Sequence, residues 1–222
     1  MHDARTALGR RRLCLAALAA GCGLGVGAAA PMPPATGLSF RIVRHGSPIG
    51  THSVEFTRTG DGDFDVRVTV DARVSLGPIP LVAYKHRAHE SWRGGKIAAL
   101  EGQTDRNGRH LWMAADRSAA GLQVRGSGTD PYIAPEDALP TTYWTTRLLQ
   151  VPMIGTQDGG LVHPHVAPAG TETLDSAGGP VRAHRFDLSG DLTFELWYDM
   201  ASVWAGMQFS AADGSIVHYE RL

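Results

Sequence analysis

The sequence predicts an all-β protein: an antiparallel meander that forms a highly curved sheet or open barrel. Apolar and polar residues alternate over residues 64–74, the pattern of a strand with one buried face. Asn107-Gly108 separates two further alternating runs, which is a strong sequence indication of a β-hairpin. Helical segments long enough for βαβ crossovers are missing from the sequence, so a parallel sheet is not expected.

Weaker alternation predicts the remaining strands in chain order. They are expected at residues 38–45, 51–58, 81–92, 97–105, 109–117, 122–126, 161–167, 181–188, 192–199, 204–211 and 216–222. Residues 126–141 contain three prolines and little periodicity, and a loop of this length is often a lid or a plug. One short helix is expected at residues 142–149, with Thr141 or Thr142 as its N-cap.

Residues 1–28 have the pattern of an export signal peptide. Arg10-Arg11-Arg12 ends a cationic start, a short apolar run follows, and small residues close the segment. The apolar run is too short and too rich in glycine for a membrane span. Residues 29–222 are then expected to form a single β-rich domain, which is long enough for one sizeable core. The mature protein is expected in the periplasm.

The export segment leaves several alternatives open. The arginines fit twin-arginine export as well as the general secretory route. Cys22 resembles the lipidated cysteine of a lipoprotein, and its lipidation would attach the protein to a membrane; secretion is a further alternative. If cleavage instead follows Ala28, both Cys14 and Cys22 are removed. The mature protein would then have neither a disulfide nor a thiol nucleophile.

Several function classes find no support in the sequence. The net charge is −1, and no basic stripe with interleaved aromatic residues indicates a nucleic-acid partner. No cofactor is expected, because phosphate-binding glycine-rich loops and nucleophile elbows are missing. His163 and His165 could share a strand face with His184 or His218, but zinc needs three or four converging ligands and no metalloprotease motif is present, so no metal is expected.

The best candidate for chemistry is the strand expected within residues 81–92. Side chains alternate along a strand, so Tyr84, His86, Glu90 and Trp92 share one face, while cationic residues occupy the other. With the cations in solvent, an inward His86 and Glu90 could act as a general acid/base pair. A buried polar network is the alternative interpretation.

Large aromatic side chains suggest where a ligand would bind. Tyr143 and Trp144 follow the proline-rich segment and are expected to cover one end of the curved sheet. Together with Tyr84 and Trp92 they would line an apolar cavity with a few polar groups, the usual form of a small-molecule site. An ordinary aromatic core without a cavity is the alternative.

The chain resembles an uncharacterised family of exported proteobacterial proteins that share a domain of unknown function. The resemblance is carried by residues 46–52, 139–144, 189–192, 195–199 and 213–215 and spans nearly all of the mature chain. It implies a β-rich single domain and brings no catalytic residues. The pattern is also similar, at the level of fold alone, to the half-barrels of periplasmic lipoprotein carriers and to lipocalin-like barrels.

Three functional hypotheses follow from these observations. The favoured one is a non-enzymatic binding module for an apolar or amphipathic ligand, such as a lipid or an envelope component. The second is a small cofactor-free enzyme, a hydrolase, lyase or isomerase, that uses His86 and Glu90. The third is an envelope interaction protein without a pocket. Contact between His86 and Glu90 inside a cavity would favour the enzyme.

Overall fold

One large antiparallel sheet makes up most of the computed structural model, which describes residues 32–76 and 79–222. The export signal expected at residues 1–28 lies outside the described residues. The sheet has 13 strands in the order β12-β13-β14-β15-β16-β1-β2-β3-β4-β5-β6-β7-β8. The all-β antiparallel prediction is therefore confirmed. In the described part of the chain the edge strands β8 and β12 do not pair, so the barrel is open.

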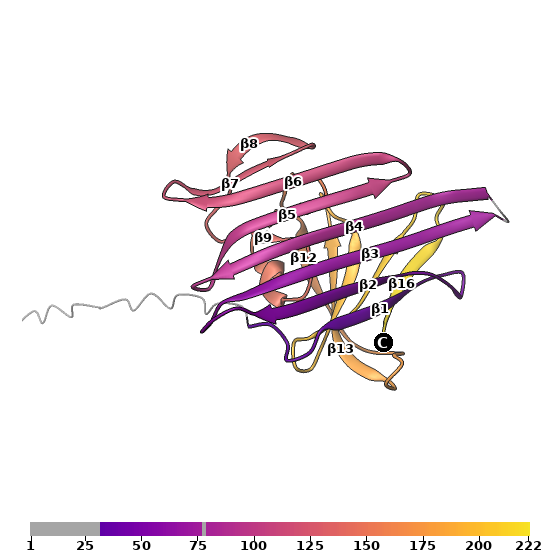
Figure 1. The fold of residues 1–222 in the computed structure, drawn as a ribbon. Coiled ribbons are helices and arrows are strands. Elements are labelled where there is room, and N and C mark those ends of the chain that lie inside the picture. Colours follow the sequence, from indigo (N-terminus) through magenta and orange to yellow (C-terminus); the bar gives the residue numbers. More distant parts are fainter. Residues whose placement is uncertain (1–31, 77–78) are drawn as a thin grey trace, which may run out of the picture.

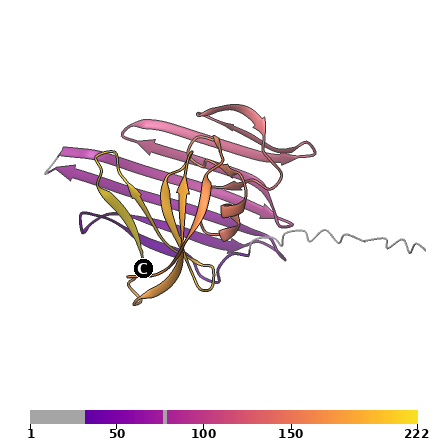
Figure 2. The same cartoon turned by 180° about the vertical axis from the view of Figure 1, so that it is seen from behind.

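The strands form two arms on either side of the β1–β16 pair. The first arm is β1 (Leu38–Arg44), β2 (Ser47–Arg58), β3 (Phe64–Leu76), β4 (Ile79–Arg93), β5 (Lys96–Arg106), β6 (Arg109–Ser118), β7 (Gly121–Gly126) and β8 (Thr129–Ile133). The second is β12 (His165–Leu174), β13 (Val181–Ser189), β14 (Phe194–Asp199), β15 (Trp204–Ser210) and β16 (Ile216–Arg221). In Figure 1 the second arm lies behind the first, and Figure 2, seen from behind, shows it in front.

Residues 134–164 connect the two edge strands, and we call them the strap. The strap contains a small sheet of β9 (Leu139–Pro140), β10 (Met153–Ile154) and β11 (Leu161–Val162), together with the 3-10 helix η1 (Thr146–Gln150). In Figure 2, η1 lies beside the strands of the second arm, on the inner side of the first arm. Its Leu148 is fully buried within the same apolar cluster as core residues of both arms. The strap therefore fills the interior of the open barrel.

Two glycines of the sheet let the strap backbone come close. A Cβ atom on Gly102 of β5 would overlap the carbonyl oxygen of Thr156, and one on Gly126 of β7 would overlap that of Asp158. Gly128 N donates a hydrogen bond of 3.0 Å to the Asp158 carbonyl. Any larger residue at Gly102 or Gly126 would push the strap away from the strands.

Two local expectations need correction. Residues 126–141 were expected to lack regular structure, yet β8 pairs with β7 there; Pro131 is tolerated because β8 is an edge strand. The short helix is the single 3-10 helix η1, and its N-cap is Thr145, whose hydroxyl accepts a hydrogen bond from Arg147 N. Thr142 cannot serve as the cap, because its side chain is buried and bonded elsewhere. None of the described residues forms a helix with the length and hydropathy of a membrane span.

Candidate functional site

Strand β4 has the two faces that the alternation predicts. His86, Glu90 and Trp92 are buried on the inner face, at 5%, 0% and 1% exposure. Tyr84 on the same face is half-buried, whereas Lys85 on the other face is exposed. The strand therefore carries polar groups into the interior, where each must find a hydrogen-bond partner or lower the stability of the fold.

Glu90 joins β4 to the strap through indole groups. Trp92 Nε1 donates to Glu90 Oε2 at 2.6 Å, and Trp144 Nε1 donates to both carboxyl oxygens at 3.3 Å. The Thr142 hydroxyl bonds the same carboxyl group. The Trp144 ring also meets Trp92 edge-on at 5.8 Å and Phe64 at 5.9 Å. We call these five residues the Glu90 cluster, and their packing is that of an ordinary core.

The buried position of Glu90 changes its acidity. Burial raises the pKa of Glu90 to about 7, although the hydrogen bonds from Thr142, Trp92 and Trp144 act to lower it. A carboxyl group that titrates near neutral pH has the acidity of a general acid or base. Here it is 0% exposed and its oxygens are already bonded, so it has no access to a substrate in this arrangement.

His86 contacts the strap at a different point. Its Nδ1 shares a hydrogen bond of 2.8 Å with Thr104 Oγ1, and its Nε2 shares one of 3.2 Å with Thr156 Oγ1. Thr156 is in turn bonded to Thr141 at 3.2 Å. Burial lowers the pKa of His86 to about 4, so the ring is neutral at pH 7. Among the described residues no hydrogen bond joins His86 to Glu90, and each side chain holds its own part of the strap.

Tyr143 and Trp144 turn away from each other. Tyr143 has φ of 62°, which is uncommon for a bulky residue, and the turn directs the two neighbouring rings to different places. Trp144 is 2% exposed in the Glu90 cluster rather than at an open mouth. The Tyr143 ring packs against Phe194 at 5.4 Å and Trp204 at 5.8 Å. The sequence suggested a shared position for these two side chains, and the structure separates them.

The side chain that sequence reasoning missed is His52. It is 5% exposed on the inner face of β2, and its ring centroid lies 5.0 Å from that of Trp204, 5.6 Å from Tyr219 and 6.1 Å from Phe40. Neither ring nitrogen has a hydrogen-bond partner in the described residues. Burial lowers the pKa of His52 to about 3, and the nearby His86 contributes to this. The imidazole is therefore neutral and unsatisfied.

Three tyrosines extend this environment, and with Phe40, Trp204 and His52 we call the group the His52 cluster. Burial raises the pKa of Tyr84 to about 12 and raises those of Tyr143 and Tyr219 further. The rings of Tyr143 and Tyr219 both pack against Trp204, at 5.8 and 6.1 Å, and a charge on Tyr84 would act on both phenols. The cluster combines large ring faces with a few polar atoms, a composition that occurs both in aromatic cores and in small-molecule sites.

Metal ligands do not converge in the described part of the chain. No group of three or more His, Cys, Asp or Glu residues there is arranged to hold an ion. His163 and His165 are both exposed, and His184 shares a hydrogen bond with Thr171 on the neighbouring strand.

A comparison with models of protein families shows to which family the chain belongs. A family described as a domain of unknown function, DUF6134, matches residues 40–222. The chain belongs to this family. The expectation of an uncharacterised β-rich family is thus confirmed, and no curated protein matches the DUF6134 chain.

A solved structure supports the fold of the DUF6134 chain. The β-barrel-like protein of domain of unknown function DUF1849 from Brucella abortus matches with a TM-score of 0.58. The match covers 84% of this chain and 95% of that chain at 9% sequence identity. At this identity the likeness concerns the fold alone.

Proposed function

We propose that this protein is a non-enzymatic binding module of the periplasm, and that an amphipathic ligand binds at the His52 cluster. The observation that carries the proposal is the buried imidazole of His52, which has two ring nitrogens and no partner for either. Buried polar groups in folded proteins are bonded in most cases, and an unsatisfied one costs about 1–3 kcal/mol. A ligand that bonds to His52 would remove this penalty.

The cluster also indicates the chemistry of the ligand. A neutral imidazole donates from one nitrogen and accepts at the other, which suits a hydroxyl or amide group. A charged head group would be disfavoured, because the surrounding rings of Phe40, Trp204 and Tyr219 form an apolar environment. These rings would in turn cover the apolar body of the ligand. A lipid or envelope component with an uncharged polar head has these properties.

Binding is better supported than catalysis. An acid/base mechanism needs His86 and Glu90 to act on one substrate, yet each is bonded to different strap residues. Those bonds give both side chains a structural role in which their polar atoms are satisfied. The ring nitrogens of His52 make no such bonds in the described residues. The hydroxyl groups of Tyr84 and Tyr219, in the same cluster, would be further polar groups for a ligand.

Native mass spectrometry of protein purified from the periplasm of its own host tests the proposal. We expect the wild-type protein to lack residues 1–28 and to retain a small molecule that a His52→Leu variant loses. His184→Leu, which alters an exposed histidine on β13, is the matched control and should retain the molecule. Monododecanoyl glycerol, with one chain and a hydroxyl head, serves as a direct probe. A protein that neither retains a molecule nor binds this probe would refute the function, and full-length protein in the cytoplasm would refute the location.

A further inference from the structure

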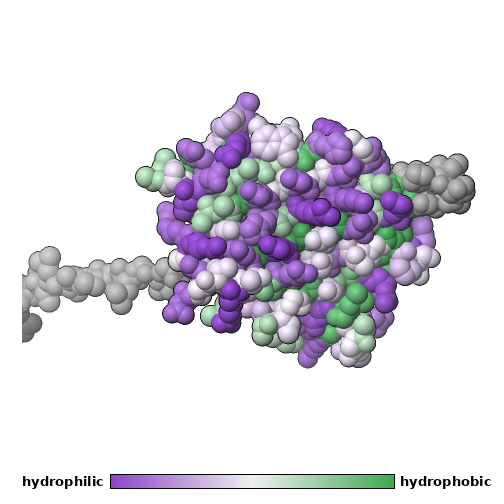
Figure 3. Space-filling view, viewed as in Figure 1, coloured by the Kyte–Doolittle hydropathy of each residue, from purple (hydrophilic) through white to green (hydrophobic). Residues whose placement is uncertain are grey.

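A groove of about 420 Å³ crosses the outer face of β4, β5 and β6. It lies on the other side of the sheet from the His52 cluster, because its exposed lining residues alternate along the strands with buried ones. Its volume is within the range of small-molecule sites, about 300–1,000 Å³. The face seen in Figure 3 is mostly hydrophilic, so the groove lies within a polar surface.

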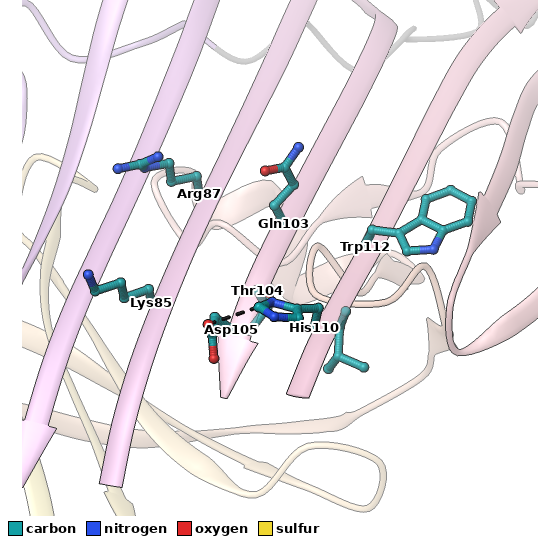
Figure 4. A pocket seen from close by; sticks show the side chains of 8 residues that line it. Lys85, Arg87, Gln103, Thr104, Asp105, His110 and Trp112 are labelled. Carbon is teal, nitrogen blue, oxygen red and sulfur yellow. Dashed lines mark ion pairs between the residues drawn. The ribbon is translucent and has the colours of Figure 1, made fainter. Parts of the chain in front are cut away.

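Three different functional groups form a row along the groove. Arg87 is the register partner of Gln103, and Gln103 is the register partner of Trp112. Neighbouring strands lie about 4.8 Å apart, so a guanidinium, an amide and an indole follow one another at that spacing. Figure 4 shows the three side chains in this order across the strands. The row presents a cation, a donor–acceptor pair and a flat apolar surface to one ligand.

Trp112 is the exposed tryptophan of this chain. Its exposure is 47%, whereas the other four tryptophans are at most 5% exposed. Ser127 holds the Trp112 backbone from both sides: Trp112 N donates to Ser127 Oγ at 3.0 Å, and Ser127 N donates to the Trp112 carbonyl at 2.9 Å. The backbone that carries this indole is therefore held in place, and the exposed ring face is open for stacking.

Arg87 is available for an anion. It is exposed, and none of the described carboxylates lies within ion-pair distance of it. Lys85, in contrast, is 3.9 Å from Asp71. A guanidinium binds a carboxylate through two parallel hydrogen bonds, which gives it direction as well as charge.

We propose that this groove binds an acidic saccharide, with a uronate unit on the Arg87–Gln103–Trp112 row. The C–H face of one sugar ring stacks on the Trp112 indole, and the Gln103 amide bonds sugar hydroxyl groups. The carboxylate of the sugar pairs with Arg87. An acidic peptide fits less well, because it offers carboxylates without a flat ring of hydroxyl groups that matches the amide and the indole. This site and its ligand are independent of the His52 cluster.

Tetragalacturonate is a suitable probe, and Trp112 supplies the optical readout. Acrylamide quenches exposed tryptophan selectively, so bound saccharide should protect Trp112 from quenching, and calorimetry should give the dissociation constant. We expect Trp112→Ala and Arg87→Gln each to weaken binding about tenfold, equivalent to about 1.4 kcal/mol. Both side chains point to solvent, so the thermal midpoint of the variants should match that of the wild type.

Two controls make the result decisive. Arg67→Gln removes an exposed arginine from the same face of β3, outside the groove, and should leave binding within twofold. Pentaglutamate carries comparable charge without sugar rings and should bind at least tenfold more weakly than tetragalacturonate. The proposal is overturned if tetragalacturonate shows no saturable binding, if pentaglutamate binds equally well, or if Arg67→Gln loses as much affinity as Arg87→Gln.

Discussion

The buried imidazole of His52 is expected to lower the stability of the fold, because neither ring nitrogen has a hydrogen-bond partner in the described residues. The rings of Trp204 and Tyr219 provide packing, but they leave both imidazole nitrogens without a conventional hydrogen bond. Residues at binding sites commonly reduce stability in this way, because selection keeps them for what they bind. The consequence can be measured without knowing the ligand.

Replacing His52 by leucine should stabilise the ligand-free protein by about 1–2 kcal/mol, because an apolar side chain of similar size removes an unsatisfied buried group. Urea denaturation at pH 7.5 measures the free energy of unfolding. His184→Leu, at an exposed site, should change it by less than about 0.5 kcal/mol. A loss of more than about 1 kcal/mol in His52→Leu would show that the imidazole contributes stabilising contacts.

The residue pattern predicted some of this site and missed the rest. Alternation along β4 placed His86 and Glu90 correctly on the inner face, because the period of a strand is a local property of the chain. Their partners Thr156 and Trp144 come from the strap, whose position depends on packing between distant elements. A lone histidine in an alternating run gives the same pattern whether it is bonded or not, so the sequence did not distinguish His52.

The strap is the element that turns an open sheet into a filled barrel. Its attachment combines the hydrogen bonds of Glu90 and His86 with the close backbone contacts at Gly102 and Gly126. Glycine within a strand normally lowers the stability of the fold, and replacing it by alanine usually raises the free energy of unfolding. At Gly102 we expect the opposite effect.

Gly102→Ala should lower the free energy of unfolding by about 1–3 kcal/mol, because the new methyl group overlaps the Thr156 carbonyl and forces the backbone apart. Displacement of the strap should also expose Arg147 in η1, which is half-buried, to trypsin. Gly178→Ala, where a Cβ atom meets only an ordinary contact, is the control. Unchanged stability and unchanged trypsin resistance in Gly102→Ala would show that the strap does not depend on this approach.

The same element shows why local patterns were insufficient. The prolines of residues 126–141 indicated an irregular loop, but Pro131 occupies an edge strand, where no ladder hydrogen bond is lost. The expected helix shortened to a 3-10 turn that begins after Thr145, because Thr142 and Trp144 are held by Glu90. Both differences come from tertiary contacts.

Three buried titratable groups shape the stability of the whole molecule. Burial lowers the pKa of His52 to about 3 and that of His86 to about 4, from an ordinary 6.5. It raises the pKa of Glu90 to about 7 from 4.5. Between pH 4.5 and 6.5 the unfolded chain therefore protonates two imidazoles, whereas the folded chain protonates one carboxyl group, so the unfolded state binds about one proton more.

Stability should consequently rise by about 1.4 kcal/mol per pH unit up to about pH 6. It should then level off near pH 7, because the imidazoles of the unfolded chain and Glu90 of the folded chain lose their protons together. Urea denaturation from pH 5 to 8 measures this profile. His52→Leu should flatten the rise, because one of the two imidazoles is gone. Glu90→Gln should steepen the rise, because the folded chain no longer protonates a carboxyl group there. A wild-type profile that is flat between pH 5 and 6.5 would contradict the assignment.

The pairing of β1 with β16 has a consequence for how the protein is made. Phe40 is the register partner of Arg221, so the first strand of one arm pairs with the last strand of the other, which is synthesised much later. Each arm can form hairpins as it is synthesised, but the seam between them closes only after the ribosome has passed residue 221. Pairing between such distant segments is slow. The pairing of β1 with β16 is therefore expected to be a late step of folding, after hairpins have formed within each arm.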